Sequence, residues 1–241
     1  MASANKIQSR YWLSFSVIAV IVLAGVFVLG VLDRDRLAAL IETGGTIESF
    51  PFVFLVLGGV CAAIAARRSG RFILWGLFAL FCFFLAGEEA AWGTESVLGW
   101  TLFPQPEAAD PIDLHNVVSS DIKDRLFDGE KLSISEGAWY LIYGTIVLVA
   151  GGFLLACLWL GTFGGGPLFD RGPLRHVRIT NPPIQFLIAG FGLMVFANID
   201  FFQGAGLAYM PGVWPLEETY ELLGSLAFAF VGLTGVARAQ R

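Results

Sequence analysis

The chain has 241 residues, of which 56% are hydrophobic and 15% are charged, and its mean hydropathy is +0.71. This composition is apolar enough to span a bilayer, so it excludes a chain made only of soluble domains. The formal net charge is −5, and the basic residues form no patch beyond what membrane topology explains, so we expect no nucleic-acid partner.

Six segments of the chain reach or approach the length of about 20 mostly apolar residues that a transmembrane helix needs. The first is longer than the apolar core of a cleavable signal peptide and is followed by no A-x-A-like site, so we expect a retained helix. The second is the shortest. The predicted spans are residues 11–32, 51–66, 72–91, 138–161, 183–202 and 216–236. They predict an all-α polytopic membrane protein, a six-helix transmembrane bundle that forms a single domain over residues 1–241.

Lys and Arg residues predict how this bundle is oriented. Ten of the fifteen fall in one set of alternate loops and at the two chain ends, and five fall in the other set. Because cytoplasmic loops carry the excess of Lys and Arg, both termini are predicted to be cytoplasmic and the long 92–137 loop lies outside. We therefore expect a multi-pass protein of a bacterial inner (plasma) membrane, with the lipid bilayer as its first partner.

Between the first two spans, the outer segment 33–50 contains Leu37–Ile41, which we expect to form a short interfacial helix. The chain also has three cysteines, at positions 61, 82 and 157, and all of them lie within predicted spans. There we expect them to act as small apolar residues rather than as disulfide partners or metal ligands.

Acidic residues are concentrated on the predicted outer side, where nineteen of the twenty lie and Asp170 is the exception. Several of them lie at the ends of apolar spans, where a carboxylate is costly unless it is paired, protonated or metal-bound. Seventeen residues separate Arg71 from Glu88, and the same number separate Glu221 from Arg238. Each interval is roughly 26 Å of helix, so Glu88 and Glu221 are predicted to lie in the same layer of the membrane.

A divalent metal site at this layer is the functional hypothesis, since carboxylates combined with a histidine suit iron, manganese or zinc. His115 is the histidine on the acidic side. The predicted ligands are Glu88, Glu89, His115, Asp200, Glu218 and Glu221. Of these, Glu88, Glu89 and Glu221 are also the predicted catalytic acid or base groups.

The alternative interpretation is that Glu217 and Glu218 stabilise the start of the last helix through its dipole, while the other acids reach headgroup water. Glu88 and Glu89 fit this alternative least. They end the third span, and the helix dipole disfavours negative charge at a C-terminal end.

Three blocks of sequence carry a family resemblance. They read Gly-Glu-Glu-Ala-Ala-Trp-Gly from Gly87, Leu-His-Asn from Leu114, and Glu-Glu-Thr-Tyr-Glu-Leu from Glu217. In this order they resemble a group of bacterial polytopic inner-membrane proteins with Gly-Glu-Glu-x-x-Trp-Gly, Leu-His-Asn and Glu-Glu-x-x-Glu-Leu blocks. Thr94 departs from that pattern, where a Gln is expected. The group has no established activity, so the resemblance implies only that the three blocks work as one unit.

Three functions agree with these residues. The first is a metal-dependent enzyme that acts at the outer face on a lipid or isoprenoid substrate. The second is a non-enzymatic accessory or assembly subunit of a membrane complex, for which small residues in the fourth span offer packing faces to membrane-protein partners. The third is a cation or proton pathway, which is disfavoured because no acid lies deep in any span. Whether the protein is an enzyme is left open by the sequence.

Overall fold

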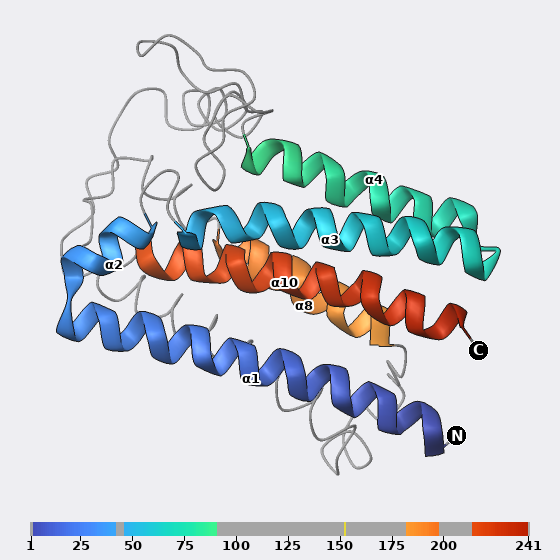
Figure 1. The fold of residues 1–241 in the computed structure, drawn as a ribbon, viewed down its shortest axis with the longest axis horizontal. Coiled ribbons are helices and arrows are strands. Elements are labelled where there is room, and N and C mark those ends of the chain that lie inside the picture. The colour runs from blue at the N-terminus through green and yellow to red at the C-terminus, as the bar shows by residue number, and fades with distance from the viewer. Residues whose placement is uncertain (1, 42–45, 91–151, 153–181, 198–213, 241) are drawn as a thin grey trace, which may run out of the picture.

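The computed structural model describes residues 2–41, 46–90, 152, 182–197 and 214–240, and within these ranges the regular elements are all α-helices (Figure 1). The predicted span 138–161, apart from one position, and the predicted loop 92–137 lie outside the described residues. The helices are α1 (Ala2–Leu32), α2 (Arg34–Ile41), α3 (Thr46–Ser69), α4 (Phe72–Glu89), α8 (Pro182–Ala197) and α10 (Trp214–Ala239).

Four of these helices, α1, α3, α4 and α10, are long and apolar enough to cross a membrane. The 16 described residues of α8 make a shorter apolar helix. The prediction of a helical chain with several helices able to cross a membrane is confirmed to this extent, while membrane insertion, the six-span count and the cytoplasmic termini stay predictions. The two ends of the chain lie at the same end of the bundle (Figure 1).

The short helix expected before the second span is present as α2, and it begins three residues earlier than predicted. Its start is capped by Asp33, whose Oδ1 accepts a hydrogen bond from the Arg36 amide at 3.0 Å. A side-chain oxygen in this position satisfies an amide that the helix cannot pair. Leu37 is buried, which ties α2 to the bundle.

The helix that contains the second predicted span is longer than the apolar run from which the span was predicted. α3 begins at Thr46, five residues before the expected start at Pro51, so that 21 residues from Ser49 to Ser69 can cross a membrane. Pro51 removes one helical hydrogen bond. Ser49 and Pro51 are both buried, and this packing keeps the turn before the proline helical.

α10 is the central helix of the described bundle. Of the stretch of α10 that is long and apolar enough to cross a membrane, 72% is buried, compared with 11% for α1 and 17% for α4. α10 packs most extensively against α3 and α8, while α4 packs mainly on α3 (Figure 1). The outward sides of α1 and α4 expose large apolar side chains such as Phe27 and Leu80, which suits a lipid environment.

α3 and α10 run in parallel with their backbones in close contact. A Cβ placed on Gly232 would lie 2.6 Å from the Gly58 oxygen and 2.8 Å from Cys61 Cβ, and one on Gly58 would lie 3.1 Å from the Phe228 oxygen. A side chain at Gly232 would therefore force the backbones apart, and one at Gly58 would require its neighbours to give by a few tenths of an ångström. Close packing through small residues is typical of membrane helices, which gain little from the hydrophobic effect against each other.

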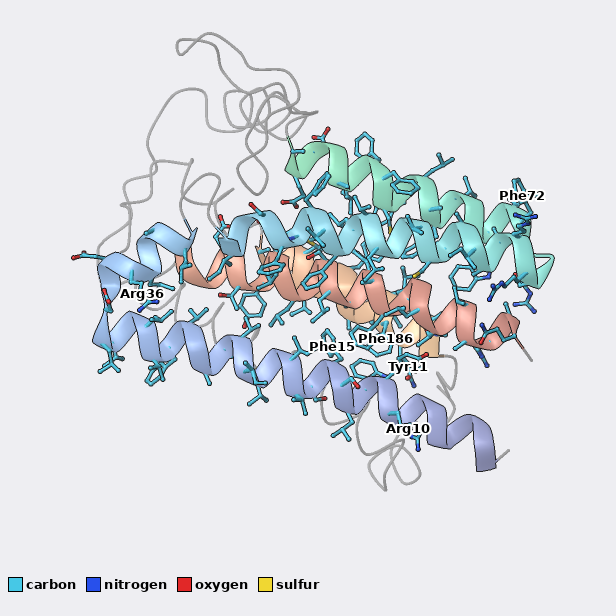
Figure 2. The ribbon with its side chains drawn as sticks, in the orientation of Figure 1. Arg10, Tyr11, Phe15, Arg36, Phe72 and Phe186 are labelled. Carbon is cyan, nitrogen blue, oxygen red and sulfur yellow. The ribbon has the colours of Figure 1, made fainter. Side chains whose placement is uncertain are left out.

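α1 is held to the bundle by the first half of its apolar stretch. Trp12 stacks on Phe186 with ring centroids 4.1 Å apart, and its Nε1–H donates a hydrogen bond to Gln185 Oε1 at 2.8 Å. Phe15 contacts the Phe186 and Phe230 rings edge-on (Figure 2). Between residues 20 and 32, no residue of α1 is buried. The contacts of α1 with α8 and α10 are therefore concentrated near the end where the chain begins.

Candidate functional site

Charged residues of the described chain gather at the two ends of the bundle. Both termini lie at the end where α3 ends and α4 begins (Figure 1). All of the described charged residues at this end are basic. Figure 2 shows Phe72 at this end and Arg36 at the opposite one. That opposite end carries the described acidic residues, which are Asp33, Asp35, Glu48, Glu88, Glu89, Glu217, Glu218 and Glu221.

Three aromatic rings from different helices meet where α4, α8 and α10 adjoin; Phe228 is fully buried, whereas Phe191 is 45% exposed. Phe81 of α4 lies 5.4 Å from Phe228 of α10 and 5.3 Å from Phe191 of α8, measured between ring centroids. Phe191 and Phe228 are also 5.3 Å apart. These distances are typical of favourable edge-to-face and tilted pairs. We call this cluster the aromatic junction; it fixes the relative level of the three helices.

Two of the predicted site residues lie at one level beyond this junction. Glu88 comes seven residues after Phe81, and Glu221 comes seven residues before Phe228. α4 and α10 run in opposite directions, so both intervals lead toward the acidic end (Figure 1). Seven residues are about two helical turns and return to nearly the same face. Glu88 and Glu221 therefore lie on the sides of their helices that face the junction, each about 10 Å beyond it.

Glu89 and Glu218 lie beside this pair on the same two helices. All four side chains are partly buried, and none of them lacks an interaction partner. Glu218 precedes Glu221 by three residues, so the two share a face of α10. The four carboxylates concentrate negative charge where the apolar helices α4 and α10 reach the acidic end of the bundle.

The remaining predicted ligands, His115 and Asp200, lie outside the described residues. Within the ranges that the structure describes, no group of three or more His, Cys, Asp or Glu side chains is placed to hold a metal ion. α4 packs mainly on α3 rather than on α10, which explains why the acids of α4 and α10 do not form such a group by themselves. A metal centre of the predicted kind therefore requires ligands from the rest of the chain.

Buried hydroxyl residues next to the acids of α10 were not singled out from the sequence. Thr219 is fully buried beside Glu218. Ser225, also fully buried, donates a hydrogen bond to the Glu221 backbone oxygen at 2.9 Å and lies within 3.0 Å of the Leu222 oxygen. This bond satisfies a hydroxyl within its own helix. The signal that could have found both residues is their place in an otherwise apolar span.

Comparisons of this chain with protein-family models, with curated proteins and with solved structures found no match. The resemblance of the three sequence blocks to bacterial inner-membrane proteins therefore stays a prediction. Any functional conclusion depends on the charges, levels and contacts described above.

Proposed function

We propose that this chain is an integral protein of a bacterial inner membrane whose acidic end faces outward and binds a divalent metal ion. Glu88, Glu89, Glu218 and Glu221, together with His115 and Asp200, supply the ligands and the acid or base groups. The metal serves an enzyme that acts on a lipid or isoprenoid substrate. The observation that carries this proposal is the aromatic junction, which supports a common level for Glu88 and Glu221 on facing sides of α4 and α10.

We propose that Asp200 lies toward the same end of the bundle. The described part of α8 ends at Ala197, and α8 runs toward the acidic end (Figure 1). Phe191 of this helix belongs to the aromatic junction, and Asp200 follows it by nine residues. We propose that Asp200 adds the third carboxylate and that His115 adds the nitrogen ligand.

The chemistry of the acids favours a metal over a purely interfacial role. Partly buried carboxylates at the edge of apolar helices repel one another, and a divalent cation removes that repulsion. Oxygen ligands with a histidine suit iron, manganese or zinc. Such an ion can polarise a phosphoryl or carbonyl oxygen, or activate a bound water at neutral pH. A substrate with a polar head and an apolar tail matches a site at the boundary between apolar and polar surfaces.

Replacement of Glu88, Glu221 or His115 by Gln tests the metal site. Gln keeps the shape of Glu but loses its charge, and in place of His115 it lacks the imidazole nitrogen, so we expect each variant to lose bound metal, measured by elemental analysis of the detergent-purified protein. We also expect each variant to melt at a lower temperature than the parent. Asp35→Asn, an exposed acid at the same end of the bundle, is the matched control and should keep both the metal and the melting temperature.

The opposite result has a clear meaning. If the carboxylates are only interfacial, the two Glu→Gln variants remove a charge near hydrocarbon and should melt at or above the parent temperature. If the parent protein also binds no metal, the metal site is excluded. The accessory-subunit hypothesis would then be the better supported one.

A further inference from the structure

The basic end of the bundle brings together arginines from three segments of the chain. α3 and α10 are parallel and locked in register, because a Cβ on Gly232 would lie 2.8 Å from Cys61 Cβ. Arg67 follows Cys61 by six residues, and Arg238 follows Gly232 by six residues. Equal intervals along two parallel helices end at equal levels, so Arg67 and Arg238 terminate neighbouring helices side by side.

The start of α4 joins the same corner. A Cβ on Gly235 would lie 2.4 Å from the ring of Trp75, so the indole of α4 lies directly against the backbone of α10. Arg71 precedes Trp75 by one turn, and Arg238 follows Gly235 by nearly one turn. Both intervals lead away from the acidic end. The tight connection between α3 and α4, with Gly70 at a φ of 68°, keeps Arg71 next to the end of α3.

We refer to Arg67, Arg68, Arg71 and Arg238 as the basic corner. All four residues are exposed, and no described acidic residue lies at this end of the bundle. Immediately on the apolar side of Arg71, the first turn of α4 exposes Phe72 by 72% and Ile73 by 77%. Guanidinium groups thus border an open apolar surface, which is the pattern that a phosphate attached to acyl chains requires.

Helix dipoles explain only part of this arrangement. Arg67, Arg68 and Arg238 lie in the last turns of α3 and α10, where a positive charge is favourable. Arg71 instead precedes the first residue of α4 and provides no side-chain cap for its amides. A positive charge is unfavourable at that position, and an anion held between Arg71 and its neighbours would remove the conflict.

We propose that the basic corner binds the headgroup of an anionic phospholipid from the leaflet at the basic end, with the acyl chains lying against the exposed first turn of α4. Guanidinium groups pair with phosphate oxygens through two parallel hydrogen bonds, which an ammonium group cannot do. This inference concerns the end of the bundle opposite the proposed metal site and does not depend on it.

Thermal unfolding in detergent, with and without added lipid, tests the proposal. We expect phosphatidylglycerol to raise the melting temperature of the full chain and to remain bound in native mass spectrometry, whereas phosphatidylcholine does neither. The double variant Arg67→Gln/Arg71→Gln should bind phosphatidylglycerol on the order of tenfold more weakly. The matched control, Arg34→Gln/Arg36→Gln, removes the same charge at the acidic end and should behave like the parent.

Three results would overturn the proposal. One is an equal response to phosphatidylglycerol and phosphatidylcholine. Another is an equal loss in both double variants, which would indicate a general charge effect. The third is full stabilisation by inorganic phosphate or glycerol 1-phosphate, which would identify a soluble anion as the ligand. If the double variant does not fold, Arg71→Gln alone must weaken phosphatidylglycerol binding more than Arg36→Gln does.

Discussion

At the scale of single residues, the contact of α3 with α10 limits which residues can replace the glycines that form it. A Cβ on Gly232 would meet the Gly58 oxygen at 2.6 Å, and a backbone atom cannot turn aside as a side chain can. We therefore expect Gly232→Ala to push the two helices apart and to cost about 1–3 kcal/mol of stability. The measurement is the midpoint of thermal unfolding in detergent, followed by circular dichroism.

Gly25 of α1 provides the matched control. A Cβ at this position would meet nothing within 4 Å, so Gly25→Ala should be neutral or should gain roughly 0.5–1 kcal/mol from the better helix propensity of alanine. Equal melting temperatures for the two variants would show that the close approach of α3 and α10 is absent in the protein.

The sequence predicted the level of Glu88 and Glu221 but not which way they face. Counting residues from Arg71 and Arg238 gives depth, because the rise per residue of an α-helix is constant. Orientation depends on which ring contacts which, and nearly every position of α4 is apolar, so no polar face marks its inner side. The contact of Phe81 with Phe228 supplies that information. The site itself, including the part that rests on His115 and Asp200, stays a prediction.

At the scale of helices, the bundle depends on the contacts that α10 makes through Phe228. Its ring is fully buried, contacts Phe78, Phe81 and Phe191, and lies over Gly190, where a Cβ would come within 2.6 Å of it. Phe228→Ala would leave a cavity where three helices meet, with an expected cost of about 3–5 kcal/mol.

The control for this substitution is Leu77→Ala, which truncates a side chain of α4 that is 62% exposed. It should change the melting temperature little, since surface positions contribute within about 0.5 kcal/mol. If Phe228→Ala is no more harmful than Leu77→Ala, the aromatic junction does not hold the three helices at their common level. The main support for the proposed acidic site would then be lost.

Helix positions were easier to predict than helix ends. A run of apolar residues shows where a helix crosses the membrane, but its first turns depend on tertiary contacts. The early start of α3 at Thr46 rests on the burial of Ser49 and Pro51, which composition does not reveal. The polar start of α1 at Ala2 is likewise outside the apolar run that predicted it from Tyr11.

At the scale of the whole molecule, the two ends of the bundle have opposite electrostatic character. The basic end holds the termini and the basic corner, and the acidic end holds the proposed metal site (Figure 1). An excess of Lys and Arg on one side directs that side to the cytoplasm. The anionic lipids of the inner leaflet would then contact the basic corner, while a substrate from the outer leaflet would reach the acids.

Cysteine labelling in intact cells tests this orientation. In a variant whose three native cysteines are replaced by Ala, Asp35→Cys places a thiol at the acidic end and Arg68→Cys places one at the basic end; both positions are exposed. We expect a membrane-impermeant maleimide to label position 35 in intact spheroplasts, and to label position 68 only after the membrane is permeabilised. Labelling of position 68 but not of position 35 before permeabilisation would show that the orientation is the opposite of the predicted one. The proposed metal site would then face the cytoplasm, and the basic corner would meet the outer leaflet.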